Sequence, residues 1–400
     1  MERIYLASFH QSKFGKLLDM TVPQIVTNAI EGACRQIDVP AALVDVGSIG
    51  ATCNFTLNEQ GLLAGLMAMV PGLEGKPLDA VENACASGGQ AVLSVINKLQ
   101  AGMGDVGVAV GYEKMRDREG KMDAKLVGKV LGYFSFPAER EGKTFVFPHL
   151  FAEVMQEYMK AHGVSEEQLA QIAVQEYACA KYNPCAQMNK VQITLEQAMK
   201  IEGINRYVVD GLPLKTYDCS QISDGYAALL LATEEGLNKL GRKKEECIEV
   251  AGWGQATDPL RKEGRDVLRP AGAYKAMNQA YRMAGVKPAE VNVAEVHDCF
   301  TVMGAIGAEV IGKAEPGKGA AFWCDGKAAP DGECGINTSG GLIAKGHPVG
   351  ATGVAMLGWA AMQLLHQAPQ ELQVKGARVA ATFNIGGPIC ASVCTVLKPA

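Results

Sequence analysis

The sequence predicts an α/β protein made of two successive halves with one shared order of elements. Strand and helix patterns alternate over the first 110 residues, and the same alternation returns in the second half of the chain. Residues 113–163 interrupt it with a charged, glycine-containing and then aromatic stretch. Alternating strands and helices favour a parallel sheet that is covered on both faces. The duplication is inferred from element order alone, and the interruption is typical of a functional loop region.

Each predicted element is a short apolar run or an amphipathic pattern bounded by turn residues. The first half is expected to contain strands at Ile4–Ser8, Leu78–Asn83 and Val106–Val110, and helices at Pro23–Ile37 and Ala86–Gln100. A capping box from Ser165 to Gln168 starts another helix after the interruption. The remaining expected strands are Ala227–Ala232, Ile248–Gly252, Val291–Val296, Arg378–Phe383 and Ala391–Leu397, with helices at Ala271–Ala284, Thr301–Ile311 and Val349–Leu365.

Length, net charge and composition exclude several classes of protein. The chain has 400 residues, which is too long for one ordinary core. A net charge of -5 offers no basic footprint for nucleic acid, and no apolar run is long enough to span a membrane. The N-terminal segment has no apolar stretch of the kind found in secretory signals, so a cytoplasmic location is expected. The 12 cysteines show no zinc-site spacing and are expected to be free thiols.

A cysteine stands at a predicted strand-to-helix junction, in the segment NACASGG at residues 83–89. A thiol at a helix N-terminus feels the positive end of the helix dipole, so we expect its pKa to be lowered. The small residues around Cys85 leave room for a substrate. The alternative is a buried structural cysteine.

Three further segments offer polar chemistry at predicted junctions. The glycine-rich run SGGLIAKGHPVGATG at residues 339–353 places His347 beside Pro348, which suits the first turn of the next helix. The segment VHDCFT at residues 296–301 adds a second histidine and a second thiol, although Asp298 could simply cap a helix. The segment FNIGGP at residues 383–388 could supply a backbone N–H from Gly386.

In this order and spacing, the four segments resemble the thiolase superfamily over nearly the whole chain. VHDCFT resembles the H-D-C-F box of sterol-carrier-protein-type thiolases, which replaces an N-E-A-F box in other thiolases. CSQISDG at residues 219–225 also resembles a family segment. Asn384 departs from the common pattern, which has a catalytic cysteine at this position; Cys299 supplies the second thiol instead.

The resemblance implies the αβαβα thiolase fold, with two βαβαβαββ halves and an inserted loop domain, normally as a homodimer. The N-terminal half would comprise residues 1–112 and 221–250, the loop domain 113–220, and the C-terminal half 251–400.

The resemblance also implies a mechanism for cleaving or forming 3-oxoacyl-CoA. Cys85 would carry the acyl group, His347 would take its proton, and Cys299 would act as acid and base. His297 and His347 would form one oxyanion hole, and the backbone N–H groups of Cys85 and Gly386 the other. No metal or tightly bound cofactor is implied, and coenzyme A is a substrate.

The substrate prediction rests on six aromatic residues between 133 and 151. Phe147, His149 and Phe151 are expected to contact the acyl group, unless these aromatics are only loop-domain core. Arg116, Arg118 or Arg140 would suit a free carboxylate or a CoA phosphate. The chain resembles the benzoylsuccinyl-CoA thiolases of anaerobic toluene degradation. The alternative is an acetoacetyl-CoA thiolase (acetyl-CoA C-acetyltransferase) supplying a hydroxymethylglutaryl-CoA synthase.

Other functions share this fold. A ketosynthase or hydroxymethylglutaryl-CoA synthase also uses cysteine with histidine, but the thiol of Cys299 argues against both. A non-catalytic lipid carrier or scaffold would be expected to lose some of the four polar side chains, all of which are present. Some members of this subgroup work with a small partner subunit made of a zinc ribbon and an OB-fold. Such a partner is an expectation from the resemblance only.

Overall fold

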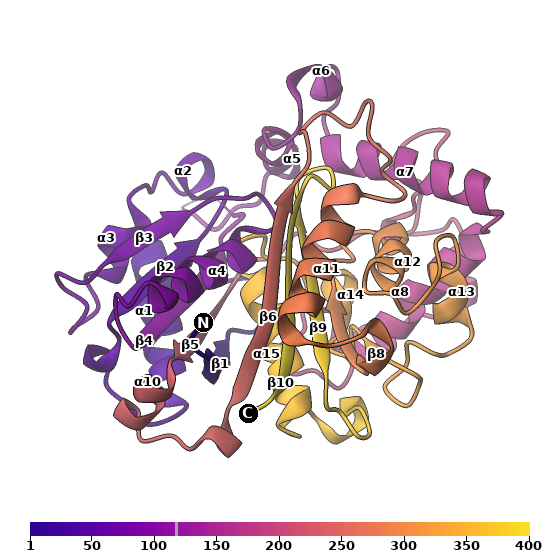
Figure 1. The fold of residues 1–400 in the computed structure, drawn as a ribbon. Coiled ribbons are helices and arrows are strands. Elements are labelled where there is room, and N and C mark those ends of the chain that lie inside the picture. Colours follow the sequence, from indigo (N-terminus) through magenta and orange to yellow (C-terminus); the bar gives the residue numbers. More distant parts are fainter. Residues whose placement is uncertain (117–118) are drawn as a thin grey trace.

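The fold was analysed in a computed structural model, which describes residues 1–116 and 119–400 (Figure 1). The strands of these residues form one sheet in the order β3-β2-β4-β5-β1-β6-β10-β9-β7-β8. Their bounds are β1 Tyr5–Gln11, β2 Val46–Gly50, β3 Leu78–Val81, β4 Val106–Glu113, β5 Gly225–Ala232, β6 Ile248–Thr257, β7 Val293–Val296, β8 Gly335–Ile336, β9 Ala380–Gly386 and β10 Ala391–Pro399.

The two halves of the sheet repeat one strand order. Counting outward from the centre, β1, β5, β4, β2 and β3 correspond to β6, β10, β9, β7 and β8. The halves meet where β1 pairs with β6 at Tyr5–Glu249 and Leu6–Ile248. This order confirms the expected pair of βαβαβαββ halves.

The helices form layers on both sides of each half-sheet. Their bounds are α1 Val22–Arg35, α2 Asn54–Leu57, α3 Leu63–Met67, α4 Ser87–Gln100, α5 Ala124–Gly132, α6 Pro137–Arg140, α7 Val146–His162, α8 Glu166–Ala180, α9 Leu195–Met199, α10 Glu234–Lys239, α11 Ala271–Ala284, α12 Thr301–Val310, α13 Gly319–Cys324, α14 Gly341–Lys345 and α15 Thr352–Leu364. Helices α4 and α15 pack together between the two half-sheets, whereas α1 covers β5 and α11 covers β6 (Figure 1). This is the expected αβαβα arrangement.

The prediction of a parallel sheet was only partly right. Strand β2 pairs in parallel with β3 and β4, and β7 with β8 and β9. Strands β5 and β1 run antiparallel to their neighbours, as do β6 and β10. For β9 and β10 the reason is connectivity, because they are joined by a turn at residues 387–390 and a connection this short permits only antiparallel pairing.

The stretch 113–163, which was expected to be a loop, carries helices α5 to α7 in its described part, whereas α8 begins after Ser165 with the predicted capping box. Residues 113–220 leave the sheet between β4 and β5, and the described part of this region carries α5 to α9 (magenta in Figure 1). Gly128 and Gly132 weaken the helical pattern of α5, but they let it pack against the start of α7. A Cβ at Gly128 would lie 2.8 Å from the Phe145 ring, and one at Gly132 would lie 2.6 Å from Val146.

Strand β2 was not predicted, because its sequence VGSIG is short and contains two glycines. Close packing against the backbone of α4 requires the second of them, Gly50. A Cβ at Gly50 would lie 2.3 Å from the carbonyl oxygen of Ser87, the first residue of α4. Among the described residues, no helix is long and apolar enough to cross a membrane.

Candidate active site

Cys85 lies in the turn between β3 and α4, as the sequence predicted. Ala84 adopts a left-handed backbone conformation with φ of 47°, which makes the turn sharp. The Ser87 hydroxyl stabilises the turn by donating to the Ala84 carbonyl at 2.7 Å and accepting from the Asn83 N–H at 2.8 Å. Gly88 serves packing rather than substrate access, because a Cβ there would lie 2.5 Å from the Gly350 carbonyl.

The thiol of Cys85 does not have the lowered pKa expected from its helix position. Burial, and then the nearby Glu113 carboxylate, raise its pKa to about 12. The backbone N–H groups of Gly387 and of Cys85 itself act in the opposite direction but are outweighed. The resting thiol is therefore protonated, and an attack on a carbonyl requires a base.

His347 lies in the loop between α14 and α15. Helix α15 begins at Thr352, later than the Val349 start that was predicted, so Pro348 precedes the helix. The His347 ring is fixed by a 2.6 Å contact between its Nδ1 and the Thr352 hydroxyl, and its backbone N–H donates to the Ser223 hydroxyl at 2.9 Å. Burial lowers the pKa of His347 to about 3. The imidazole is therefore neutral at ordinary pH and free to accept a proton.

His297 and Cys299 lie between β7 and α12. Nδ1 of His297 is 2.9 Å from the side-chain amide of Asn384, and burial places the pKa of His297 well below its usual value. Burial, and next the proximity of Cys85, raise the pKa of the Cys299 thiol. Asp298 accepts the backbone N–H groups of Leu342 and Ile343, so it caps α14 rather than the helix that follows it.

The structure brings all four predicted catalytic side chains to one cavity of about 140 Å³. The Cys85 sulfur and ring nitrogens of His297 and His347 all lie within 4.8 Å of one another. The two rings meet edge to face, with centroids 4.9 Å apart. Cys and two His are ligand types that zinc accepts; the neutral histidines beside protonated thiols equally suit proton transfer and acyl transfer.

Aromatic side chains from α7 and from the start of α12 wall the cavity. Phe147 and Phe151 line it, and Phe151 stacks on Phe300 with ring centroids 4.7 Å apart. His149 does not reach the cavity, and its Nε2 lies 3.4 Å from the Glu153 carboxylate. Residues four apart share a helix face whereas residue i+2 points away, so the helical structure of α7 explains why His149 is separated from the other two.

The arginines proposed for a carboxylate or phosphate are not in the cavity. Arg116 is buried in an ion pair with Asp224 at 3.0 Å. Arg140 stacks on the Tyr133 ring and donates to its carbonyl. Arg118 lies outside the described residues. None of the described residues that line the cavity is lysine or arginine.

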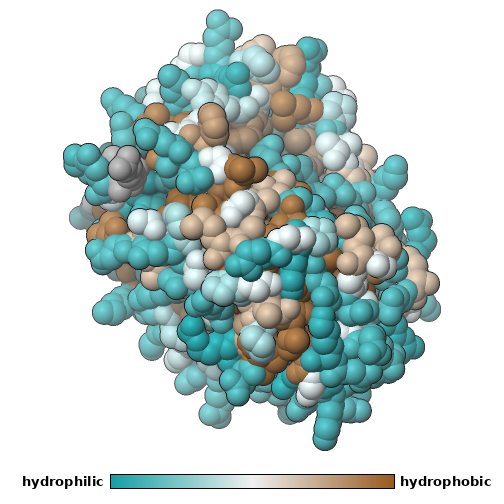
Figure 2. Space-filling model, turned by 90° about the vertical axis from the view of Figure 1, so that its left-hand side faces the viewer, coloured by the Kyte–Doolittle hydropathy of each residue, from teal (hydrophilic) through white to brown (hydrophobic). Residues whose placement is uncertain are grey.

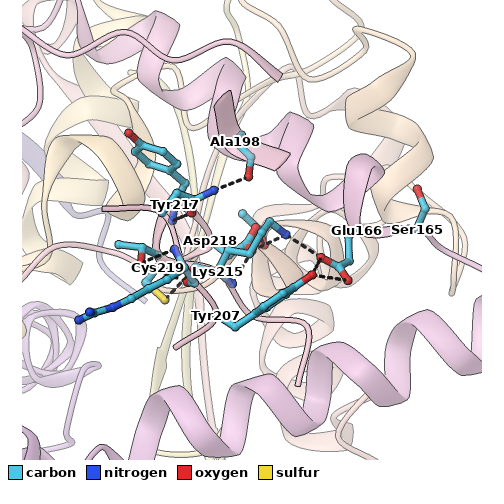
Figure 3. Close-up of polar contacts among 12 residues, drawn as sticks. Ser165, Glu166, Ala198, Tyr207, Lys215, Tyr217, Asp218 and Cys219 are labelled. Carbon is cyan, nitrogen blue, oxygen red and sulfur yellow. Dashed lines mark hydrogen bonds and ion pairs between the residues drawn. The ribbon is translucent and has the colours of Figure 1, made fainter. Parts of the chain in front are cut away.

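Residues 219–222 form one wall of the cavity, a role that the sequence did not reveal. Cys219 pairs through its backbone with Phe300, and Ile222 with His347, so this one segment contacts both histidine-bearing loops. Behind it, Lys215 is buried between Asp218 at 3.0 Å and Glu166 at 3.1 Å (Figure 3). Asp218 also accepts from the Thr301 hydroxyl at 3.0 Å, which links the 113–220 region to the start of α12.

Comparisons with known proteins agree with this geometry. The thiolase N-terminal domain model matches residues 4–235, and the thiolase C-terminal domain-like model matches residues 254–399. The chain is 34% identical over 389 residues to an acetyl-CoA acetyltransferase of Methanothermobacter thermautotrophicus, covering 97% of each protein. It is 30% identical over 391 residues to benzoylsuccinyl-CoA thiolase subunit BbsB of Thauera aromatica, covering 96% of this chain and 95% of that one.

The solved structure of an Ltp2-ChsH2(DUF35) aldolase superposes with a TM-score of 0.80 at 19% identity, covering 99% of this chain and 98% of that one. At this identity the likeness concerns the fold. Both domain models together span most of the sequence, and they meet at the cavity that holds Cys85 and His347. The chain therefore belongs to the thiolase family and is an acyltransferase of the thiolase type.

Proposed function

We propose that the protein cleaves a 3-oxoacyl-CoA with coenzyme A through an acyl group carried on Cys85. The observation that supports this proposal most strongly is that one cavity is lined by Cys85, His297, Cys299 and His347. In the first step, His347 takes the Cys85 proton and the sulfur attacks the 3-oxo carbon. The C2–C3 bond then breaks, the acyl group remains on sulfur, and Cys299 protonates C2 to release acetyl-CoA or its substituted analogue.

In the second step, the thiol of coenzyme A gives its proton to Cys299, which had lost its own, and its sulfur attacks the acyl group. Acyl-CoA leaves, and the Cys85 sulfur recovers the proton that His347 held. Run backwards, the same steps are a Claisen condensation. Oxygen charge would be stabilised in one hole by His297 and, once it holds the Cys85 proton, by His347, and in the other hole by the N–H groups of Cys85 and Gly386. The amide of Gly387 acts on the Cys85 sulfur and is a further donor candidate.

For the acyl group, we propose an uncharged apolar or aromatic residue. A cavity of about 150 Å³ holds a benzene molecule in another protein, so this cavity of about 140 Å³ suits one ring. Its lining is mostly phenylalanine and aliphatic side chains, with the four catalytic candidates and the uncharged polar residues Cys219, Ser220 and Gln221. A free carboxylate would require a charged partner, and none of the described lining residues supplies one.

Three candidate substrates can be compared: benzoylsuccinyl-CoA, acetoacetyl-CoA and a neutral aromatic 3-oxoacyl-CoA. Benzoylsuccinyl-CoA is favoured by the similarity to BbsB, and with it a place in toluene degradation. Acetoacetyl-CoA is favoured by the higher identity to an acetyl-CoA acetyltransferase. Thiolysis rates for these two and for benzoylacetyl-CoA, which has the ring without the carboxylate, separate the three cases. Cleavage of benzoylsuccinyl-CoA would leave the uncharged benzoyl group on Cys85 and release the carboxylate in succinyl-CoA. A preference for benzoylsuccinyl-CoA over benzoylacetyl-CoA would therefore show that the site accepts a carboxylate on C2, and a preference for acetoacetyl-CoA over both would contradict the aromatic acyl group.

The acyl-enzyme itself has a direct test. Intact-protein mass spectrometry after incubation with acyl-CoA should show one acyl adduct on the wild type and on Cys324→Ala, which removes an exposed thiol. Cys85→Ala should show none and should lose turnover. An adduct that persists on the Cys85 variant would refute the assignment of the nucleophile.

For assembly, we propose a cytoplasmic homodimer that pairs through β3. This strand lies at one end of the sheet and has an unpaired edge. The neighbouring face carries three large exposed side chains, Phe55, Leu62 and Met69, and Figure 2 shows hydrophobic surface on this side of the molecule. The likeness to the Ltp2-ChsH2(DUF35) aldolase motivates a second proposal, a small zinc-ribbon and OB-fold partner. Thiolysis assays with and without such a subunit test it.

A further inference from the structure

Asn384 lies between the backbone of Cys85 and the imidazole ring of His297. It lies in β9 and is 1% exposed. Its side-chain nitrogen Nδ2 is 3.1 Å from the Cys85 carbonyl oxygen and 2.9 Å from Nδ1 of His297. Asn384 is not one of the four catalytic candidates, and the proposed mechanism gives it no role.

The hydrogen-bond directions around Asn384 follow from its two neighbours. A carbonyl oxygen can only accept, so the atom that faces Cys85 O must be the NH₂ group and not Oδ1. The second hydrogen of that NH₂ then points at His297 Nδ1, which must accept it. A neutral imidazole with an accepting Nδ1 carries its proton on Nε2.

The neighbouring histidine is held in the opposite tautomer. The Thr352 hydroxyl lies 2.9 Å from the Pro348 carbonyl, which can only accept, and we assign its single hydrogen to that carbonyl. Its oxygen can therefore only accept from His347 Nδ1, 2.6 Å away, so His347 carries its proton on Nδ1 and has a bare Nε2. The site thus pairs one histidine that offers a proton acceptor with one that offers an N–H donor.

We infer that Asn384 is a positioning residue that holds His297 in the Nε2–H tautomer. His297 Nε2 is buried and has no hydrogen-bond partner among the described residues, so its N–H is available to a substrate oxygen. The presence of a substrate oxygen at this position depends on the proposed thiolase function, whereas the tautomer of His297 does not. In this tautomer His297 is an oxyanion donor, and His347 alone is the base for Cys85.

The amide is suited to this position for two reasons. One nitrogen with two hydrogens serves two acceptors at once, which a hydroxyl, a thiol or a carboxylate cannot do. The space is also fixed, since a Cβ at Gly353 would lie 2.3 Å, and one at Gly89 2.8 Å, from Asn384 Oδ1. A longer side chain has no room between α4 and α15.

Nitrogen NMR of the full-length protein labelled on its histidine rings tests the inference directly. The chain has six histidines, so the two site rings can be assigned by comparison with His297→Ala and His347→Ala. The expected wild-type spectrum has a pyridine-like Nδ1 and pyrrole-like Nε2 for His297, and the reverse for His347. A pyrrole-like Nδ1 in His297 would overturn the inference.

Two variants connect the tautomer with activity. Asn384→Asp cannot donate and should move the His297 proton to Nδ1, and Asn384→Ala should leave a mixture. Asn384→Asp should lower kcat about 100- to 1000-fold with little change in KM, the size of effect seen when one oxyanion donor is lost. Asn384→Ala should lower kcat only in proportion to the fraction of His297 that loses its Nε2 proton. Thr382→Ser, a buried neighbour on β9 that keeps its hydroxyl, should behave as wild type.

The outcomes separate this inference from the proposed function. Acylation of wild-type Cys85 together with unchanged kcat in Asn384→Asp would overturn the positioning role and leave the thiolase mechanism intact. If NMR shows the expected tautomers but Cys85 is never acylated, the role of Asn384 stands and the proposed mechanism is refuted.

Discussion

The Glu113 carboxylate accepts a hydrogen bond from the Gly350 backbone N–H at 3.1 Å, which joins the end of β4 to the loop of His347. The same carboxylate accepts the N–H groups of Thr52 at 3.1 Å and Cys53 at 2.8 Å. Both of its oxygens therefore act as acceptors. One buried side chain connects three segments around the nucleophile, and this makes it a sensitive site for substitution.

We predict that Glu113→Gln lowers the free energy of unfolding by about 1–3 kcal/mol, because its NH₂ group would face a backbone N–H and leave it unpaired. The effect should depend on pH. Burial raises the folded-state pKa of Glu113 from 4.5 to about 7. An acid with a raised folded pKa loses stability as pH rises between those two values and is constant above them.

The wild-type advantage over Glu113→Gln should therefore shrink between about pH 4.5 and 7, by at most about 3 kcal/mol. Urea unfolding of both proteins at several pH values measures it. An advantage that grows over this range would mean that the three amides, rather than burial, control the carboxylate, with a folded pKa below 4.5.

The second prediction concerns the buried cation behind the cavity wall. Lys215 and Asp218 are each 1% exposed and form an ion pair at 3.0 Å. Lys215→Met should destabilise the fold by about 3–5 kcal/mol, because it leaves a buried carboxylate without its partner. The double variant Lys215→Met with Asp218→Asn removes that unpaired charge and should be more stable than the single variant.

Lys200→Met is the matched control, since its ion pair with Glu202 is exposed on both sides. It should change stability by less than about 1 kcal/mol. Thermal unfolding of the three variants measures the differences. A double variant that is as unstable as Lys215→Met would show that packing of the lysine stem, and not charge, is what this position requires.

Local pattern was enough to predict the elements that carry the chemistry. The helix Ala271–Ala284 was predicted to the residue, because its amphipathic face ends at Gly285, which adopts the left-handed conformation of a helix C-terminus. Cys85, His297 and His347 were found because each lies at a change from one element type to another. Such junctions are visible in the sequence as an apolar run followed by small or polar residues.

Properties that depend on distant segments could not be predicted. The pKa of Cys85 is set by burial and by Glu113, and neither is visible in the residues beside it. His149 was grouped with Phe147 and Phe151 because this region looked like a loop, whereas helix periodicity separates it. The tautomer of His297 depends on Asn384, 87 positions away.

The third prediction concerns which thiol of the cavity handles the α-proton. Cys299→Ala should abolish hydrogen–deuterium exchange at the methyl group of acetyl-CoA, because Cys299 handles the α-proton in the proposed mechanism. Cys219→Ala, which removes another thiol from the same cavity, should retain exchange. Proton NMR of acetyl-CoA in heavy water follows the reaction.

Acylation of Cys85 should persist in Cys299→Ala, which shows that the site has remained intact. If exchange continues at the wild-type rate, another base is responsible. Cys390 would then have been the next candidate from the sequence, but its thiol faces the Gly386 carbonyl and does not line the cavity. Cys219 would be the group to test next.

The last prediction concerns how the nucleophile is activated. Burial raises the pKa of Cys85 to about 12, so its thiolate fraction at pH 7 is small. The rate of alkylation by iodoacetamide should then rise about tenfold per pH unit from pH 7 to 10, without a plateau. A small free thiol should level off above its pKa of about 8.5 under the same conditions. Peptide mass spectrometry identifies alkylated Cys85 separately from the other cysteines. A plateau below pH 8 that disappears in His347→Ala would instead reveal a resting thiolate–imidazolium pair, and His347 would then act before substrate binds rather than during the attack.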